Sequence, residues 1–177
     1  MKGAETDIRI RLARPRDAMR LPDIERSAGT LFRAAPDLAW VADHTPTSAG
    51  FYAPLIRGGT VWVAAAGGVA PVGFVSAEVV DEDLHVWELA VRADAQRRGL
   101  GRRLMRAAMD HARAQGLAAV TLTTFRDVAW NAPFYQSLGF RVLTESELSA
   151  VQVDSLRGEA ARGLPMERRC GMRWTTP

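Results

Sequence analysis

The segment from Gln96 to Arg103 has the clearest chemical potential in this sequence. It reads Gln-Arg-Arg-Gly-Leu-Gly-Arg-Arg and follows the apolar run Leu89–Val91 after a short gap. If the segment opens a helix, its first N–H groups lack partners inside that helix, and the glycines let the backbone approach a ligand closely. These donors, the positive end of the helix and the arginines together favour an anion, most often phosphate. The sequence therefore predicts a loop that binds a diphosphate.

Two widespread phosphate motifs do not fit this spacing. A P-loop requires G-x-x-x-x-G-K-[ST], which does not occur in the chain. The dinucleotide fingerprint G-x-G-x-x-G could begin at Gly99 and Gly101, but Leu104 stands where the third glycine is required. The predicted diphosphate loop is therefore of another kind.

The first third of the chain predicts one strand and two helices. Residues Ile8–Leu12 alternate apolar and charged side chains, as a half-buried strand does. A proline in the first turn favours a helix over residues 15–29. Residues 30–50 mix prolines with polar residues and predict a loop with short helical pieces, and a second helix is expected over 47–56. The buried stripe of the first helix is expected to be Met19, Ile24 and Ala28.

The middle of the chain predicts the strands that lead to the diphosphate loop. Residues 60–64 and 72–79 are rich in apolar and β-branched residues and flank the turn signal Gly67–Gly68, which predicts an antiparallel hairpin. A third strand is expected over Leu84–Val91, after the acidic turn 81–83. This strand enters the loop directly.

The period of the apolar residues changes after the loop. Leu100, Leu104, Ala108 and Ala112 recur every four residues, which predicts an amphipathic helix that ends at Gly116. The order of elements predicts an α/β domain with a single mixed, mostly antiparallel central sheet flanked by helices. The remaining elements are expected at 120–123 (strand), 130–138 (helix), 140–143 (strand), 147–162 (helix) and 170–174 (strand).

Composition limits the class of protein. A chain of 177 residues with 47% hydrophobic and 24% charged residues suits one globular domain over 1–177. The formal net charge is only +3, which gives little reason to expect a nucleic-acid partner. The single cysteine, Cys170, allows no internal disulfide, and no Cys, His and carboxylate spacing predicts a metal site. Because residues 1–9 are polar and no apolar run is long enough for a bilayer, a soluble, cytoplasmic protein without a membrane partner is expected.

The loop and a second segment downstream resemble one family, the GCN5-related N-acetyltransferases (GNAT). Their pyrophosphate loop has the pattern [QR]-x-x-G-x-[GA], which Gln96–Gly101 matches between the Leu89–Val91 strand and a helix. The family also has a helix that ends in a tyrosine, followed by a Gly-Phe pair that opens the next strand. Tyr135 and Gly139–Phe140 match this pattern. The similarity in element order covers nearly the whole chain, with the acetyl-CoA-binding core expected over about 84–143.

The resemblance implies an N-acetyltransferase that uses acetyl-CoA. A primary amine would attack the thioester directly in a ternary complex, and Tyr135 would be the general acid near the sulfur. The family's asparagine commonly lies seven residues before the tyrosine, where this chain has Val128, so the counterpart is placed at Asn131. The residues that the resemblance places against the cofactor are Leu89, Ala90, Val91, Gln96, Arg97, Arg98, Gly99, Leu100, Gly101, Arg102, Asn131 and Tyr135.

The general base is sought on the strand before the loop. An alkylammonium has a pKa of about 10.4, so the reacting amine must lose a proton. Because Leu89 and Val91 are expected in the core, strand alternation turns Glu88 to the opposite face, where it could bind the ammonium or relay its proton. The other interpretation of Glu88 is a solvated or salt-bridged side chain. His85 is a second candidate base, and strand alternation points it away from Glu88.

Several functions remain open at the level of sequence. The acceptor could be a small-molecule or peptide amine, including a protein N-terminus or lysine, and the donor could be another acyl-CoA. A non-catalytic acyl-CoA sensor of the same fold is the alternative from a different class, and Glu88 and Tyr135 favour an enzyme over it. A homodimer through the C-terminal strands, where Trp174 lies, is expected by analogy with the family.

Overall fold

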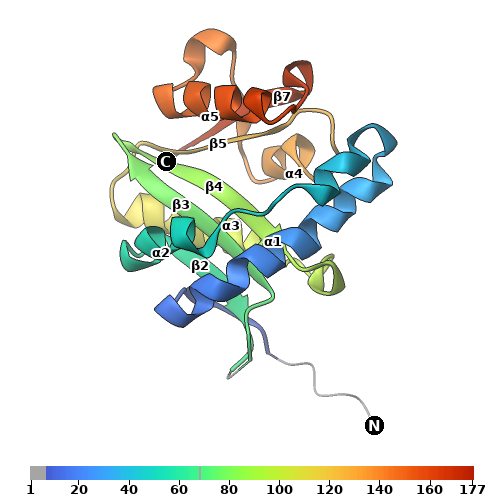
Figure 1. Ribbon diagram of the computed structural model, residues 1–177. Coiled ribbons are helices and arrows are strands. Elements are labelled where there is room, and N and C mark those ends of the chain that lie inside the picture. The colour runs from blue at the N-terminus through green and yellow to red at the C-terminus, as the bar shows by residue number, and fades with distance from the viewer. Residues whose placement is uncertain (1–6, 68) are drawn as a thin grey trace. The chain divides into compact units, whose positions relative to one another are not determined.

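The computed structural model describes residues 7–67 and 69–177 (Figure 1). Contacts between residues divide the chain into two compact units. We call Met1–Ala77 with Glu88–Ala108 the N-terminal unit, and Glu78–Trp87 with Met109–Pro177 the C-terminal unit. The prediction of a single domain over 1–177 stays a prediction. Gly68 of the expected turn, and residues 1–6 of the expected polar N-terminus, lie outside the described residues.

The sheet has seven strands in the order β1-β2-β3-β4-β5-β7-β6. The pairs β1–β2, β2–β3, β5–β7 and β6–β7 are antiparallel, whereas β4 and β5 run parallel. The predicted mixed, mostly antiparallel sheet flanked by helices is therefore confirmed. The strands are β1 (Arg9–Leu12), β2 (Val61–Ala65), β3 (Gly73–Val80), β4 (Asp83–Val91), β5 (Ala119–Phe125), β6 (Arg141–Val142) and β7 (Arg169–Thr175).

The helices lie close to the predicted positions. The apolar stripe of α3 is buried as expected, and Leu104, Ala108 and Ala112 are each 0% exposed. Short 3-10 helices, labelled η, fill several connections. The α-helices are α1 (Leu21–Gly29), α2 (Ala49–Arg57), α3 (Leu100–Ala114), α4 (Ala132–Gln136) and α5 (Ala150–Ala161). The 3-10 helices are η1 (Pro15–Arg20), η2 (Thr30–Ala34), η3 (Pro36–Asp43), η4 (Ala93–Ala95), η5 (Glu145–Glu147) and η6 (Met166–Arg168).

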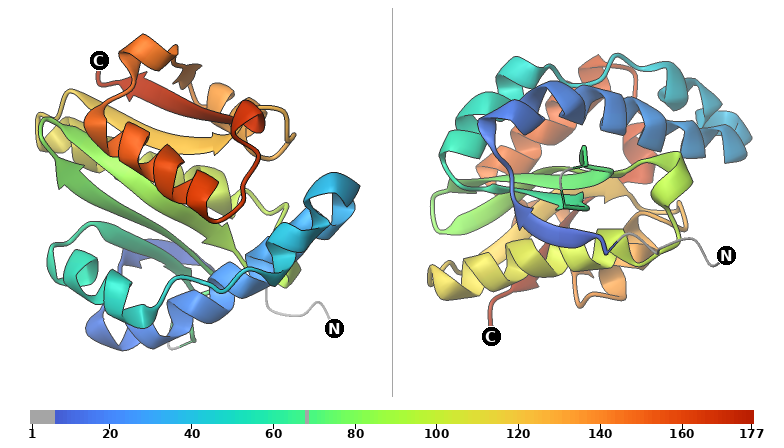
Figure 2. Two further views of the ribbon diagram at one scale, coloured as in Figure 1. Left: turned by 45° about the horizontal axis from the view of Figure 1, so that its top comes forward. Right: turned by 90° about the horizontal axis from the view of Figure 1, so that it is seen from below.

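In the N-terminal unit, helices pack on both faces of the strands. The right-hand view of Figure 2 shows α1 and α2 on one side of β2 and β3 and the beginning of α3 on the other. Tyr52 of α2 packs edge-on against Phe74 of β3, with ring centroids 5.2 Å apart. On the opposite face, a Cβ placed on Gly73 would lie 3.4 Å from the Leu104 side chain of α3. Phe74 therefore faces α2, and Gly73 faces α3.

The prediction that Met19 belongs to a buried stripe is wrong. The chain forms a 3-10 helix over Pro15–Arg20 before α1 begins, and Met19 is 73% exposed. A 3-10 helix has three residues per turn instead of 3.6, so the buried side shifts to Asp17 and Ala18. Asp17 accepts hydrogen bonds from the backbone N of Arg14 and from the Arg11 guanidinium, both at 2.7 Å. The buried side of this segment therefore carries the Asp17 carboxylate, where the sequence predicted the apolar side chain of Met19.

The connection between α1 and α2 has the short helical pieces that the sequence predicts. Both are 3-10 helices, and Leu38 and Ala42 of η3 are buried. The following helix, α2, begins at Ala49, two residues later than expected. The Ser48 hydroxyl accepts a hydrogen bond from the backbone N of Phe51 at 3.4 Å, and this cap fixes the start of α2.

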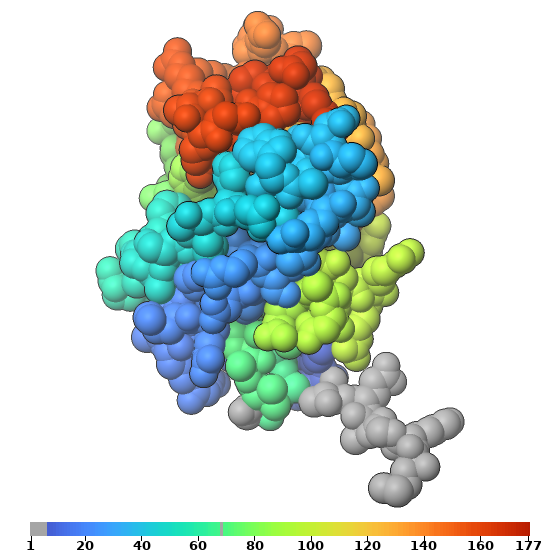
Figure 3. All heavy atoms as spheres, turned by 45° about the vertical axis from the view of Figure 1, so that its right-hand side comes forward, coloured from blue at the N-terminus to red at the C-terminus, as the bar shows by residue number. Residues whose placement is uncertain are grey.

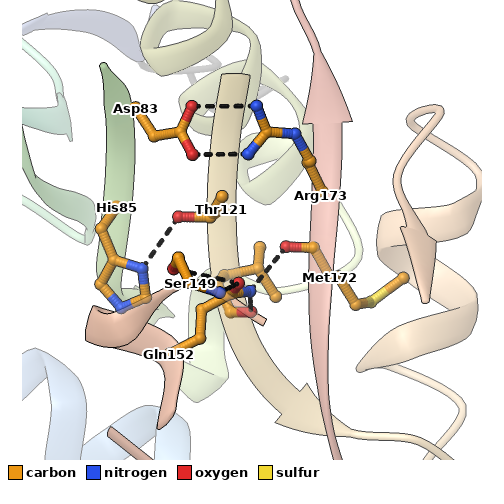
Figure 4. Close-up of polar contacts among 8 residues, drawn as sticks. Asp83, His85, Thr121, Ser149, Gln152, Met172 and Arg173 are labelled. Carbon is orange, nitrogen blue, oxygen red and sulfur yellow. Dashed lines mark hydrogen bonds and ion pairs between the residues drawn. The ribbon is translucent and has the colours of Figure 1, made fainter. Parts of the chain in front are cut away.

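In the C-terminal unit, α5 docks on the sheet through polar side chains. Its buried residues are Gln152 and Glu159. The Gln152 amide donates to the backbone oxygens of Leu122 and Met172, at 3.0 and 3.1 Å (Figure 4). A buried amide with satisfied donors fixes one position of the helix on the strands, whereas apolar contacts alone would leave it free to slide.

A buried ion pair holds the other end of α5. Arg169 of β7 donates two hydrogen bonds to the Glu159 carboxylate, at 2.7 and 2.8 Å. The Thr123 hydroxyl donates to the same carboxylate at 2.7 Å, and the two charged side chains are only 10% and 8% exposed. The Arg169 guanidinium also lies 4.5 Å from the centre of the Phe125 ring. The charge of Glu159 is therefore neutralised within the unit.

We predict that Gly171→Ala destabilises the protein. A Cβ at this position of β7 would clash with Leu148 Cδ2 and lie 2.9 Å from Gln152 Nε2. Overpacking of this kind costs about 1–3 kcal/mol of unfolding free energy, measured by urea denaturation. Gly158→Ala in α5 is the matched control. No atom lies within 4 Å of its Cβ position, so it should raise the unfolding free energy by about 0.5–1 kcal/mol. Equal effects of the two substitutions would contradict this packing.

Candidate active site

The basic loop is anchored at its base in the N-terminal unit. The Gln96 amide donates to the backbone oxygen of Val91 at 2.9 Å, which ties the loop to the end of β4. The backbone N of Ala93 donates to the Ser27 hydroxyl of α1 at 3.1 Å. In Figure 3 this yellow-green segment lies at the surface beside blue α1. One hydrogen bond to the end of β4 and one to α1 therefore anchor the loop before α3 begins.

Two residues of the loop have left-handed backbone conformations. Arg97 has φ +60° and Gly99 has φ +73°. Glycine adopts this conformation without strain, whereas a side chain such as that of Arg97 does so at some cost. Strained backbone of this kind persists where the surrounding structure requires a particular path. Here the path is a sharp turn that brings the backbone N–H groups to the start of α3.

The first turn of α3 presents donors and no acidic side chain. The backbone N of Arg103 bonds to Gly99 O at 3.1 Å, so the N–H groups of Leu100 and Gly101 come before the first bond of the helix. The first turn of α3 contains no Asp or Glu. Arg97 and Arg98 are both exposed beside it. This arrangement fits the diphosphate that the sequence predicts, because backbone donors, helix dipole and arginines act on the same volume.

Arg103 has a different role from its neighbours in the loop. Its guanidinium donates to the backbone oxygen of Ile8 at 2.7 Å. This contact links the first turn of α3 to the residue before β1. Arg103 therefore stabilises the start of the helix and its charge is directed away from the loop.

The end of β4 lies against β3 and α3. A Cβ on Gly73 would lie 3.2 Å from Val91 Cγ2 and 3.1 Å from Ala90 O, on the face that carries α3. Ala90 is 1% exposed, whereas Leu89 and Val91 are half-buried. The charge of Glu88 acts on Tyr52 of α2. The roles of all four residues stay predictions.

Tyr52 and Glu25 were not predicted as polar site residues. Tyr52 is 0% exposed, and its hydroxyl donates to the Glu25 carboxylate at 2.7 Å. Burial, followed by the charges of Glu88 and Glu25, raises the pKa of Tyr52 above its ordinary value, so the hydroxyl stays protonated. Nothing in the local pattern indicates that Glu25 meets a residue 27 positions away.

His85 is buried in the C-terminal unit, where it lies on β4. It is 1% exposed, and its Nδ1 lies 3.0 Å from the Thr121 hydroxyl (Figure 4). Its ring packs against that of Trp87. Burial lowers the pKa of His85 to about 4, because the charged imidazolium loses its hydration. The imidazole is therefore neutral at pH 7. His85 would therefore be a weak base, because its imidazolium form loses a proton readily.

Tyr135 and Asn131 lie in the C-terminal unit, on and before α4. Tyr135 is 8% exposed, and its ring packs edge-on against Phe134 and Phe140, at 5.1 and 5.8 Å. The backbone oxygen of Tyr135 accepts a hydrogen bond from the backbone N of Phe140 at 3.1 Å, across the left-handed Gly139. Asn131 precedes α4, and among the described residues its buried Oδ1 has no hydrogen-bond partner. The structure thus brings Glu88 and the basic loop together in one unit, with Tyr135 and Asn131 in the other.

Metal-binding clusters and membrane-spanning helices both bear on the class of site. In residues 7–67 and 69–177, no three His, Cys, Asp or Glu side chains are grouped so that they could hold a metal ion. The helices of the same residues include none with the length and apolar character to cross a membrane.

The mixed sheet and the crossover helix α3 define an α/β protein, and the loop Gln96–Gly101 is the part of it that fits a diphosphate. Residues 25–140 match the acetyltransferase (GNAT) family. The chain belongs to this family, which confirms the resemblance carried by Gln96–Gly101 and Tyr135.

Solved structures of acetyltransferases have the same fold. The PaiA N-acetyltransferase of Thermoplasma acidophilum, in complex with coenzyme A, has a TM-score of 0.67 at 15% identity, over 96% of this chain and 99% of its own. The ribosomal-protein-S18-alanine N-acetyltransferase of Escherichia coli gives 0.66 at 20% identity, over 96% and 94%. N-acetylglutamate synthase of Neisseria gonorrhoeae, with coenzyme A and N-acetyl-glutamate, gives 0.71 at 17% identity, over 98% of this chain and 36% of its own. At these identities the likeness shows the fold.

We predict that His85 makes the fold sensitive to acid. Its pKa is about 4 in the folded chain and about 6.5 when unfolded. Between pH 7 and pH 5 the unfolded chain therefore takes up a proton that the folded chain does not, and the unfolding free energy falls by about 2 kcal/mol from this residue. His85→Gln can keep a hydrogen bond to Thr121 without titrating, so its unfolding free energy should fall less over the same range. Identical pH dependence in both proteins, or a His85 pKa near 6.5 by NMR titration, would contradict this.

Proposed function

We propose that the protein is an N-acetyltransferase that transfers the acetyl group of acetyl-CoA to a primary amine. The observation that carries the proposal is the loop Gln96–Gly101, which leads into the first N–H groups of α3 beside exposed arginines in a chain of the acetyltransferase family. Acetyl-CoA supplies an activated acyl group as a thioester. A diphosphate is the part of that molecule for which the donors of the loop are suited.

The loop and the end of β4 would bind the cofactor mainly through the backbone. Free N–H groups at the start of α3, with Arg97 and Arg98 beside them, support a role in holding the diphosphate. We assign the pantetheine arm to the main chain of β4. The residues proposed to contact the cofactor are Leu89, Ala90, Val91, Gln96, Arg97, Arg98, Gly99, Leu100, Gly101 and Arg102. The resemblance to the family adds Asn131 and Tyr135.

Glu88 is proposed to take the proton that the acceptor ammonium must lose, directly or through a water molecule. It is half-buried on β4, and its charge acts on Tyr52 of α2. An unprotonated amine nitrogen can then form its bond to the acetyl carbon while the bond from that carbon to sulfur breaks.

Tyr135 is proposed to protonate the departing sulfur, by resemblance to the family. Support comes from the packing of its ring between Phe134 and Phe140, which fixes the direction of the side chain. Tyr135→Phe keeps this packing and removes only the hydroxyl. It should slow turnover while leaving the affinity for acetyl-CoA unchanged, and the opposite result would reduce the role of Tyr135 to packing.

Calorimetric titration with acetyl-CoA tests the proposed function, with ATP as a comparison ligand. We expect micromolar affinity for acetyl-CoA and for CoA, and much weaker binding of ATP, because ATP lacks the pantetheine arm that β4 would bind. Gly99→Val should weaken acetyl-CoA binding, since Gly99 has φ +73°, which a β-branched residue adopts only with strain. Gly158→Val in α5 is the control for adding the same side chain elsewhere. Absence of binding at near-millimolar acetyl-CoA would refute the proposal.

The role of Glu88 is tested by the pH dependence of Glu88→Gln. If Glu88 removes the ammonium proton, the substitution should slow turnover most at pH values below the pKa of the acceptor amine. Above that pKa the amine is already neutral, so the two proteins should approach the same rate. Release of CoA is measured across the pH range with saturating acetyl-CoA. A constant ratio of the two rates at all pH values would exclude Glu88 as the base.

A further inference from the structure

A fixed carboxylate without a cation lies between α1 and α2 in the N-terminal unit. Glu25 is half-buried and accepts hydrogen bonds from the backbone N of Thr47 at 3.0 and 3.1 Å, from the Thr47 hydroxyl at 3.2 Å and from the Tyr52 hydroxyl at 2.7 Å. All these donors are neutral. Among the residues that the structure describes, Glu25 forms no ion pair with Arg, Lys or His. The negative charge is thus positioned but not neutralised.

Tyr52 lies where the charges of two carboxylates act. Its ring packs on Phe74 of β3, its hydroxyl donates to Glu25, and the charge of Glu88 raises its pKa further. Because Tyr52 stays protonated, it can share a hydrogen bond with a neighbour but cannot remove negative charge. Two carboxylates that act on one neutral hydroxyl create a potential that favours a cation.

A buried hydroxyl without a partner lies on the same face of the sheet. Ser76 is 0% exposed, and among the described residues its Oγ has no hydrogen-bond partner. Ser76 and Phe74 share one face of β3, because side chains alternate along a strand. The ring of Phe74 packs on Tyr52, so Ser76 lies two residues along β3 from that contact. A buried hydroxyl left unpaired is costly, so its presence on the face that carries Tyr52 points to a polar group supplied by a ligand.

We propose that Glu25, Tyr52, Ser76 and Glu88 form an acceptor subsite for an amine that carries a second positive charge. This inference rests on the proposed function, because it describes the acceptor of the same reaction. Glu88 would face the nitrogen that reacts, and Glu25 would bind the cationic group that stays protonated. The hydroxyls of Tyr52 and Ser76 would accept hydrogen bonds from the N–H groups of the acceptor.

The same electrostatics disfavour other acceptors. An acceptor with a carboxylate beside its amine would bring a third negative charge to a place that already has two. A neutral acceptor would bind without repulsion, but it would leave the charge of Glu25 uncompensated. The acceptor class that the subsite fits is therefore a diamine or another amine of net charge greater than one.

Three acceptors with the same four-carbon chain test this class. They are 1,4-diaminobutane, butylamine and 4-aminobutanoate, whose second ends are cationic, neutral and anionic. We expect kcat/KM for diaminobutane to exceed that for butylamine by at least about tenfold, the effect of one hydrogen bond to a charged group, with aminobutanoate lowest. A twofold difference would follow from its two reactive nitrogens alone. This ranking uses the unaltered protein and does not depend on a variant that folds.

Glu25→Gln assigns the preference to a residue. Glutamine keeps the shape of the side chain and one acceptor oxygen but removes the charge. The ratio of the diaminobutane and butylamine kcat/KM values should therefore fall at least about tenfold, the effect expected of that charge. Asp23→Asn is the matched control. Asp23 also lies on α1, and its side chain is 68% exposed beside Arg26, so the ratio should stay at its original value. Binding of acetyl-CoA verifies that each variant is folded.

The outcomes separate this inference from the proposed function. If acetyl-CoA does not bind, the proposed function fails. If acetyl-CoA binds but butylamine is used as well as diaminobutane, or none of the three amines is acetylated, the cationic subsite is refuted and the cofactor assignment stands. An unchanged ratio in Glu25→Gln, or an equal loss in Asp23→Asn, would likewise overturn the role of Glu25.

Discussion

The parallel pairing of β4 with β5 is the constraint on which the rest of the chain depends. Its register covers Asp83–His85 against Ala119–Thr121. Two parallel strands that follow each other in sequence require a crossover connection, because a tight turn can join only antiparallel strands. That connection is α3, so the loop after β4 must also be the loop that opens a helix. The free N–H groups of a helix start therefore lie directly after the strand whose backbone is proposed to bind the cofactor.

Two carboxylates show how differently the chain treats buried charge. Glu159 of α5 forms a two-bond ion pair with Arg169 of β7 and accepts a further bond from Thr123. Glu25 of α1 receives only neutral donors from Thr47 and Tyr52. A paired charge fixes packing, as it does beneath α5, whereas an unpaired one keeps its attraction for a cation. The difference between the two sites is the physical reason to regard the first as structural and the second as a place for a ligand.

The sequence was sufficient for features that depend on neighbouring residues. The order of strands and helices, the apolar stripe of α3 and the loop Gln96–Gly101 follow from local periodicity and glycine spacing. Met19 was misplaced because a helical period of 3.6 was assumed where the chain forms a 3-10 helix. The low pKa of His85 could not be predicted, since it comes from burial, which strand alternation does not measure. The polar contact face of α5 could not be predicted from the sequence pattern either. Polar residues such as Gln152 and Glu159 are expected to be exposed unless their partners on β5 and β7 are known.

The family can be recognised from neighbouring residues, whereas the acceptor depends on residues that are far apart in the sequence. The donors for the diphosphate come from one continuous segment, so their spacing is fixed by the backbone and visible as a motif. The groups around Tyr52 come from α1, α2, β3 and β4, and their separation in sequence depends on the length of each connection. Connections of this kind vary in length without disturbing the strands, so no spacing rule marks such residues. The cofactor can thus be inferred from sequence, whereas the charge of the acceptor requires the folded arrangement of Glu25, Ser76 and Glu88.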